Sequence, residues 1–229
     1  MQLITITGGR TLHGRIRPAA AKNSVLPLLA ATLLCRTPSR LRAVPPLADV
    51  ATSLALLQSV GAKAERQGSD LFVAPGQDLQ GEIPDYLAGA MRSSVFYLAP
   101  LLCRVGEVRL PLPGGCKLGP RPVDIHLAGL AAMGAQVELE GIAVTLRRRG
   151  PLHGVDFALR LPSVGATMTL MMAATQAGGT TILRGAACEP EICDLANFLR
   201  ACGAHITGAG TPVVVIQGGK PLQGTAWTP

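Results

Sequence analysis

The sequence has 229 residues, of which 48% are hydrophobic, 15% are charged and only 3% are aromatic. This composition predicts a globular protein with a large core and excludes a mainly disordered chain. The formal net charge of +7 indicates an anionic partner. Nucleic acid is a poor candidate, because so few aromatic side chains cannot form a stacking platform for bases. A small phosphorylated substrate explains the charge better.

The first residues, Met1 to Thr7, contain neither a basic leader nor an apolar core. We therefore expect no secretory signal and a cytoplasmic protein. The longest apolar stretches, residues 25–35 and 167–177, fall short of the ~20 residues that a membrane helix needs. They are predicted to be buried helices, and no membrane contact is expected. In this setting the cysteines are expected to be reduced, and most of them to pack as small hydrophobic side chains.

Two strand-like segments open the chain, at residues 2–6 and 12–16, and form a hairpin-like pair that fits no repeat. A threefold repeat follows. Gly61, Gly134 and Gly203 each stand in the same helix-ending pattern and recur about every 70 residues. Each glycine is expected to end a helix in the left-handed conformation. A strand pair is predicted after each glycine, at residues 63–74, 136–147 and 205–217.

Upstream of each glycine lies a helix that is apolar nearly all round, at residues 24–35, 93–103 and 166–177, and such helices are buried. Short apolar runs after them, at 40–44, 108–110 and 180–183, indicate buried strands. The predicted fold is therefore α/β (α+β), with three modules of helix, strand, helix and strand pair, each preceded by a strand. The modules are expected to close around their buried helices.

The predicted domain is residues 22–221. The ends lack a partner in this scheme: residues 1–21 are expected to supply strands to a further domain, and residues 222–229 to form a crossover stub that leads to it.

Each module begins its buried helix with polar or basic residues, and the repeat places the three helix starts together. Helix amino-termini bind anions, and Lys22 and Arg92 add positive charge. The alternative is that the Ser, Asn and Thr residues here serve only as N-caps. The three clusters are Lys22-Asn23-Ser24, Arg92-Ser93-Ser94 and residues 163–167.

A second candidate region is the loop of residues 112–124, which is rich in glycine and proline. Its Cys116 lies close to Lys117 and Arg121, which would favour the reactive thiolate. Cys188 and Cys193 have the spacing of a metal pair but no second pair of ligands, so neither a metal nor a cofactor is expected. His126 could position a substrate or merely cap a helix.

These residues together resemble the UDP-N-acetylglucosamine enolpyruvyl transferases over the whole chain, and the Gly-Gly-Cys loop separates that family from its shikimate-pathway relative. The motifs that carry the resemblance are Lys22-Asn23, Met91-Arg92-Ser93-Ser94, Pro113-Gly114-Gly115-Cys116, residues 119–124, residues 163–167 and Glu189-Pro190-Glu191.

The resemblance implies an inside-out barrel domain and a reaction in which the sugar 3-hydroxyl adds to C2 of phosphoenolpyruvate before phosphate leaves. It implies catalytic roles for Cys116, as general acid at C3 and site of a covalent adduct, and for Lys22 and Arg121, which would hold the phosphate and carboxylate. It implies substrate contacts for Lys22, Asn23, Arg92, Arg121, Pro122, Val123, Asp124, Ile125, Ser163, Val164 and Gly165.

Two features depart from the family pattern. Leu161 stands where some members carry lysine, and Arg160 at a position that is often acidic. Family members also continue into a second domain that supplies an Asp and an Arg to the site. The sequence therefore favours an enolpyruvyl transferase whose activity needs a complementary second-domain polypeptide or self-association. The alternative is a non-catalytic UDP-sugar-binding or interaction module derived from that enzyme.

Overall fold

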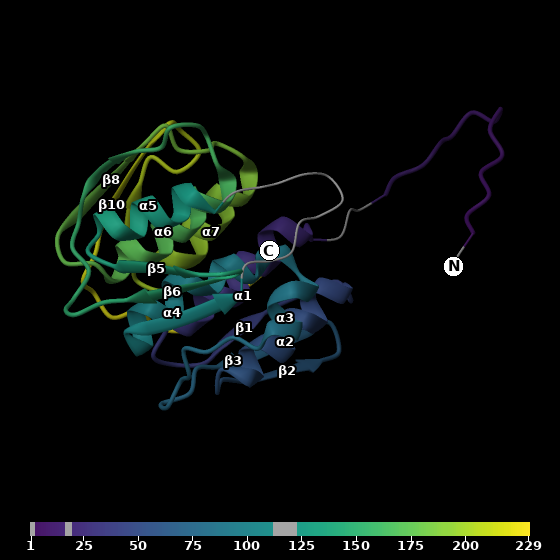
Figure 1. Cartoon of the computed structure of the whole chain (residues 1–229). Helices are drawn as coiled ribbons and strands as arrows, with labels where there is room; N and C mark the ends of the chain where they lie inside the picture. Colours follow the sequence, from purple (N-terminus) through teal and green to yellow (C-terminus); the bar gives the residue numbers. More distant parts are fainter. Residues whose placement is uncertain (1–2, 17–19, 112–122) are drawn as a thin grey trace.

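The computed structural model describes residues 3–16, 20–111 and 123–229, and its elements follow the predicted repeat (Figure 1). The apolar helix of each module is followed by a strand, a second helix and an antiparallel strand pair. The first module contains α1 (Lys22–Ala31), the 3-10 helix η1 (Thr32–Leu34), β1 (Ser39–Leu41), α2 (Ala48–Ser59), β2 (Lys63–Gln67) and β3 (Asp70–Ala74), and η marks 3-10 helices throughout.

The second and third modules repeat this order, with one helix, α3, that the sequence pattern did not predict. The second contains α3 (Asp85–Ala90), η2 (Arg92–Tyr97), α4 (Leu98–Val105), β4 (Glu107–Pro111), α5 (Asp124–Ala132), β5 (Gln136–Glu140) and β6 (Ala143–Arg147). The third contains β7 (Asp156–Ala158), α6 (Val164–Gln176), β8 (Thr180–Arg184), α7 (Pro190–Ala201), β9 (His205–Thr207) and β10 (Val213–Gln217), and β11 (Ala226–Trp227) follows it.

The three repeated glycines end their helices as predicted. Gly61, Gly134 and Gly203 have φ angles of 95°, 103° and 107°, a left-handed conformation that glycine adopts without a steric penalty. The amide of the following alanine then donates to a carbonyl in the last helical turn, at 2.9 Å from Ala62 to Leu57 and 3.0 Å from Ala135 to Leu130. The chain is thereby turned directly into the first strand of each pair.

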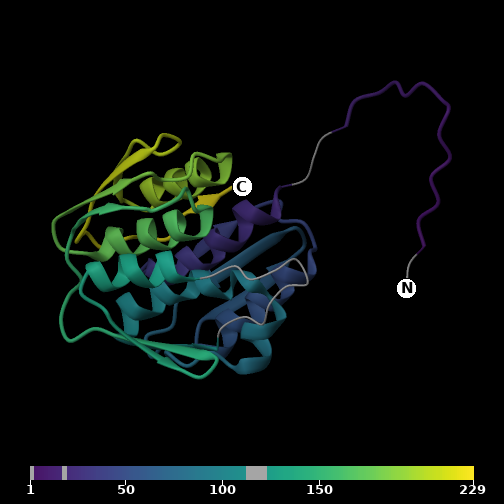
Figure 2. The same ribbon diagram turned by 45° about the horizontal axis from the view of Figure 1, so that its top comes forward.

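Each module builds one sheet, and the strand order is β11-β1-β3-β2, β4-β6-β5 and β7-β8-β10-β9. Figure 1 shows β8 and β10 at one side of the molecule and β2 and β3 at another, with α6 and α1 between them. In Figure 2, turned by 45°, the helices run side by side through the body. There α6 packs against α4, α5 and α7, and α1 against α2 and α7. The sheets therefore lie outside the helices.

Parallel pairing joins the modules in a ring. The segment after each strand pair lies beside the first strand of the next module: Glu82 pairs with Arg109 of β4, and β7 pairs with β8. After the third module, β11 returns to β1 of the first, with Arg40 opposite Ala226 and Leu41 opposite Trp227. The third connection thus closes the ring.

A glycine lies at each crossing between modules. A Cβ at Gly81 would stand 2.0 Å from the Glu107 carbonyl oxygen, one at Gly154 2.3 Å from that of Thr180, and one at Gly224 2.1 Å from that of Pro38. Such distances are far inside van der Waals contact, so only glycine lets the two backbones approach this closely. The sequence repeat therefore includes a glycine at each crossing between modules.

The expectation that residues 222–229 have no partner in this chain is wrong, because β11 pairs with β1 and Leu222 forms a bridge with Cys35. The reason is the cyclic order of the modules, in which the last segment does for the first module what Glu82 and β7 do for the others. That these residues also lead to a further domain remains a prediction.

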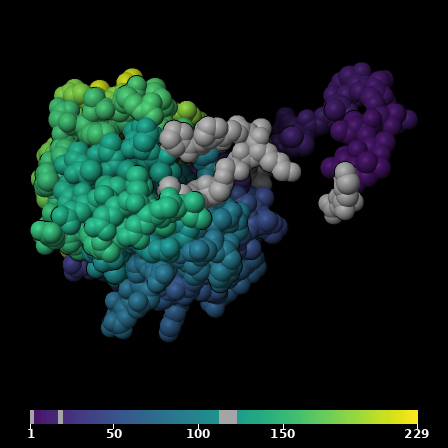
Figure 3. Space-filling model, in the orientation of Figure 1, coloured from purple at the N-terminus to yellow at the C-terminus, as the bar shows by residue number. Residues whose placement is uncertain are grey.

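The hairpin expected near the start of the chain is absent from the described residues, since residues 3–16 form no helix or strand. They extend away from the body in Figures 1 and 3. Their large apolar side chains are exposed, from 82% for Ile4 to 94% for Ile16. A two-stranded hairpin is marginal in water without a surface to pack on. The role of residues 1–21 in another domain stays a prediction.

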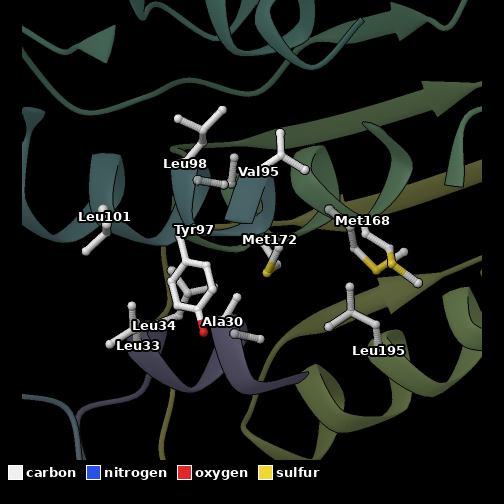
Figure 4. Close-up of a cluster of buried hydrophobic side chains, with 14 of the residues drawn as sticks. Ala30, Leu33, Leu34, Val95, Tyr97, Leu98, Leu101, Met168, Met172 and Leu195 are labelled. Atoms are coloured by element: carbon white, nitrogen blue, oxygen red, sulfur yellow. The ribbon is translucent and has the colours of Figure 1, made fainter. Parts of the chain in front are cut away.

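The core is formed by the helices of all three modules, and Figure 4 shows part of it. Tyr97 of η2 points toward Ala30 and Leu34, and its hydroxyl oxygen lies 2.5 Å from the Ser53 hydroxyl. Burial raises the pKa of Tyr97 well above its usual value. Met168 and Met172 of α6 and Leu195 of α7 join the cluster. The single core explains why the modules form one body.

Reduced thiols were predicted for all the cysteines. Those in the described part of the chain are free, and Cys116 lies outside the described residues. Cys35 and Cys202 are buried at the seam between the first and third modules, with their sulfur atoms 3.7 Å apart. None of the helices described is both long and apolar enough to cross a membrane.

Candidate functional site

A cavity of about 430 Å³ opens where several helices begin. It is bordered by the first residues of α1, the start of η2, the residue before α5 and the start of α6. Free backbone amides and the helix dipoles at these ends favour a negative charge. Its lining residues are Lys22, Asn23, Leu26, Asp49, Ala90, Met91, Arg92, Ser93, Val95, Phe96, Val123, His126, Ser163, Val164, Gly165 and Met168.

The start of α1 carries two polar side chains that are held from neighbouring helices. The Lys22 ammonium donates to Asp49 Oδ2 at 2.9 Å, and Asp49 lies in the first turn of α2. The Asn23 amide donates to Glu191 Oε1 at 3.3 Å, and Glu191 lies in the first turn of α7. The helix itself begins after Ala21 without a side-chain cap. Both residues therefore stand in the cavity through contacts from the first and third modules.

The start of η2 supplies Arg92, whose side chain is exposed at the cavity. Ser94 is buried and turned inward, and its hydroxyl donates to the Ala88 carbonyl at 3.2 Å. These two residues of the motif therefore differ in role. Ser94 connects η2 to the preceding helix α3, and Arg92 places a positive charge at the cavity.

His126 is the buried titratable group of the cavity wall. Its Nδ1 lies 3.0 Å from the Thr169 hydroxyl of α6. Burial, helped by the nearby positive charge of Arg92, lowers the pKa of His126 to about 4. The imidazole is therefore neutral at pH 7 and can act as a hydrogen-bonding group but not as a fixed cation.

The start of α6 is capped by Ser163, whose hydroxyl accepts from the Ala166 amide at 3.3 Å. Gly165 follows in the first turn, and a Cβ there would lie 3.0 Å from the Cε1 and Nε2 atoms of His126. The glycine thus lets α6 approach the histidine ring. The N-cap interpretation holds for Ser163, but it does not exclude binding because the same helix start borders the cavity.

The predicted site residues separate into three groups. Lys22, Asn23, Arg92, Val123, Ser163, Val164 and Gly165 line the cavity together, whereas Asp124 and Ile125 are not among its lining residues. Cys116, Arg121 and Pro122 lie outside the described residues.

Asp124 has a partner that its place in the sequence does not reveal. Its carboxylate accepts from the Arg160 guanidinium at 2.5 Å, and this hydrogen bond lowers the pKa of Asp124. Ile125 is buried in the core. Conversely, Asp49 lines the cavity but was not predicted from the sequence. An acid in the first turn of a helix is so common that only its distance to Lys22 could reveal it.

No group of three or more His, Cys, Asp and Glu side chains that could hold a metal ion occurs within residues 3–16, 20–111 and 123–229.

Residues 6–228 match the family of EPSP synthase (3-phosphoshikimate 1-carboxyvinyltransferase). The chain belongs to this family. Among its relatives, a UDP-N-acetylglucosamine 1-carboxyvinyltransferase from Cellvibrio japonicus is 45% identical over 98% of this chain and 54% of the relative. An enzyme of the same name from Oleidesulfovibrio alaskensis is 48% identical over 98% of this chain and 53% of the relative.

A solved structure within this fold, the enolpyruvyl transferase NikO from Streptomyces tendae, superposes with a TM-score of 0.82 at 25% identity. The match covers 96% of this chain and 52% of that protein. The chain therefore spans about half the length of the relatives it matches. Within the EPSP synthase family, its resemblance to the UDP-N-acetylglucosamine enzymes is confirmed by these similarities.

Proposed function

We propose that this chain is a catalytic half of an enolpyruvyl transferase that moves the enolpyruvyl group of phosphoenolpyruvate to the 3-hydroxyl of UDP-N-acetylglucosamine. The observation that carries the proposal is the cavity, where Lys22, Asn23 and Arg92 meet the start of α6. Relatives that are 45–48% identical over nearly the whole chain carry the name of this activity. The reaction would be the first committed step of peptidoglycan synthesis, in the cytoplasm.

The substrates explain the charge of the site. Phosphoenolpyruvate carries a phosphate and a carboxylate, and the Lys22 ammonium and the helix starts offer positive charge and amide donors to them. In the proposed reaction the sugar 3-hydroxyl gives up its proton to a base as its oxygen bonds to C2 of phosphoenolpyruvate, and an acid protonates C3. Loss of a proton from C3 and of phosphate from C2 then gives the enolpyruvyl ether. Cys116 as the acid at C3 and Arg121 as a second cation remain predictions that lie outside the described residues.

UDP-N-acetylglucosamine would occupy the side of the cavity formed by Val123, Ser163, Val164 and Gly165. Backbone groups at a helix start suit a diphosphate, because they donate without a flexible side chain. Neutral His126 beside this wall would add a hydrogen-bonding group. Asp124 would act through its ion pair with Arg160, at the start of α5.

A second candidate function is a UDP-sugar-binding or interaction module without catalysis. It is favoured by one observation: binding alone would need only the cavity wall at Ser163, Val164 and Gly165, where the start of α6 meets His126. The exposed apolar side chains of residues 3–16 support a related proposal, that a complementary second-domain polypeptide, or another copy of this chain, packs there.

The first prediction tests the activity. Purified chain is mixed with phosphoenolpyruvate and UDP-N-acetylglucosamine, and released phosphate is measured. Cys116→Ser and Lys22→Ala should each lower the rate by at least about 100-fold, as expected for loss of an acid or of a charge that stabilises the transition state. Cys188→Ser and Lys63→Ala are the matched controls, since both residues are exposed and neither lines the cavity.

Release that depends on Cys116 and Lys22 but not on the controls supports catalysis by this chain. Without release, calorimetric titration with the UDP-sugar separates the remaining cases. Binding without release, lost in Arg92→Ala, is followed by the same phosphate assay with the second domain of a relative added: release then supports the catalytic half, and its continued absence favours the non-catalytic module. A chain that neither releases phosphate nor binds the sugar contradicts both functions.

A further inference from the structure

Asp49 is an acid in a cavity otherwise suited to anions. Of the described residues that line the cavity, it is the one carboxylate. Its Oδ2 lies 2.9 Å from the Lys22 ammonium, with the two side chains 32% and 52% exposed. A carboxylate at this place would repel phosphate or carboxylate groups of a substrate, so its presence calls for a physical explanation.

The contact restricts a flexible cation. A lysine side chain has four rotatable bonds and loses conformational freedom when it is fixed in one position, which disfavours a fixed position in the absence of a partner. Asp49 is itself well anchored, because it lies in the first turn of α2, where the helix dipole stabilises a negative charge. Since α1 packs directly against α2, the pair connects the start of one helix to the start of the next.

The same contact also occupies the ammonium. A bound anion can take its full attraction from Lys22 only if the hydrogen bond to Asp49 is weakened or exchanged. The pair is partly open to solvent, so this exchange has a moderate cost, as for other surface ion pairs.

We propose that Asp49 is a positioning residue, which holds the Lys22 ammonium at the cavity before an anion arrives and competes with that anion for it. The identity of the anion as phosphoenolpyruvate rests on the proposed function; the hold on Lys22 does not. Asp49 therefore weakens the binding of the anion and improves the placement of the Lys22 ammonium.

The second prediction concerns the hold on Lys22 and needs no substrate. The chain is treated briefly with acetic anhydride, and acetylation at Lys22 and Lys63 is quantified by mass spectrometry. Asp49→Asn should speed acetylation of Lys22 about twofold to fivefold, the range expected from release of a half-exposed ion pair. Lys63, an exposed residue of β2, is the internal reference and should not change.

Two variants keep this measurement decisive. Asp49→Glu restores the carboxylate and should return Lys22 to slow acetylation, which a merely damaged fold would not do. Asp156→Asn removes another surface ion pair, with Arg184, outside the cavity, and should leave Lys22 unchanged. Equal labelling of Lys22 in wild type and Asp49→Asn would overturn the proposal.

The third prediction concerns the competition between Asp49 and the anion for Lys22. It expects tighter binding of the anion in the variant, which damage to the structure would not produce. In calorimetric titrations with phosphoenolpyruvate in the presence of the UDP-sugar, made in a Cys116→Ser background to suppress turnover, Asp49→Asn should lower Kd about twofold to fivefold, because the competing carboxylate is gone. In a Lys22→Ala background the same substitution should lose this Lys22-dependent gain. Weaker or unchanged binding in Asp49→Asn would overturn the competition.

The failures of the two proposals can be distinguished. A wild-type chain that does not bind phosphoenolpyruvate speaks against the proposed function, and the acetylation result still decides whether Asp49 holds Lys22. A wild type that binds, with an Asp49→Asn variant that binds no better, leaves the proposed function intact and overturns the competition.

Discussion

The two segments at the ends of the sequence look alike as strings of residues and differ completely in the structure. Both mix apolar with polar residues, and both were expected to lack a partner. In the structure Leu222 is fully buried, whereas Leu3 and Leu12 are about 90% exposed. A strand-like pattern therefore allows a segment to form a strand, but an available sheet edge decides whether it does so.

The edge in question belongs to β1. Its antiparallel partner β3 covers one side, and β11 covers the other. Trp227 strengthens the closure, because its indole donates to Asp194 of α7 at 3.0 Å and its ring packs edge-on against Phe198. Residues 222–227 are therefore held by backbone, polar and apolar contacts, and residues 3–16 by none of these within the described structure.

The comparison predicts its largest effect for a matched pair of leucines. Leu222→Ala should lower the free energy of unfolding by about 2–5 kcal/mol, through lost burial and the cavity left behind. Leu12→Ala should change it by less than about 0.5 kcal/mol, as for exposed positions. Urea unfolding followed by circular dichroism measures both, and similar effects of the two substitutions would show that the seam does not stabilise the fold.

A smaller effect is expected at the crossing itself. Gly224→Ala places a Cβ about 2 Å from the carbonyl oxygens of Thr37 and Pro38, so we expect a loss of about 1–3 kcal/mol from the forced separation of the two backbones. Gly8→Ala is the matched control, because nothing lies within 4 Å of its Cβ position. The same urea titrations apply, and an unchanged midpoint for Gly224→Ala would contradict the close approach.

The substitutions at Leu222 and Gly224 should affect the stability of the fold. Substitutions in the exposed residues 3–16 should instead affect association between chains. A triple variant with Ile4, Ile6 and Leu12 changed to serine should leave the free energy of unfolding within about 0.5 kcal/mol of wild type. It should also reduce self-association or capture of a complementary chain, because the apolar surface is removed. Analytical ultracentrifugation over a range of concentrations checks this. A wild type that stays monomeric at high concentration would contradict the self-association proposed for this segment.

The local structure of the modules could be predicted from the amino-acid sequence. The three strand pairs have the predicted bounds, because alternating side chains and a glycine in the left-handed conformation act within a few residues. The buried helices also lie within one or two residues of the expected ranges, although the first ends in the 3-10 helix η1 and the second begins with the 3-10 helix η2. The helix starts with Lys22, Asn23, Arg92 and Ser163 were found in the same way, through their equivalent places in the repeat.

Which distant groups meet could not be predicted from the sequence, because the closure of the fold brings them together. Pairing of β11 with β1, the hold of Asp49 on Lys22 and the pairing of Asp124 with Arg160 join residues that are separated by between 27 and almost 190 positions. No local preference specifies such contacts. They depend on how three modules close into one ring, where the burial of a common core selects the arrangement and the polar partners follow from it.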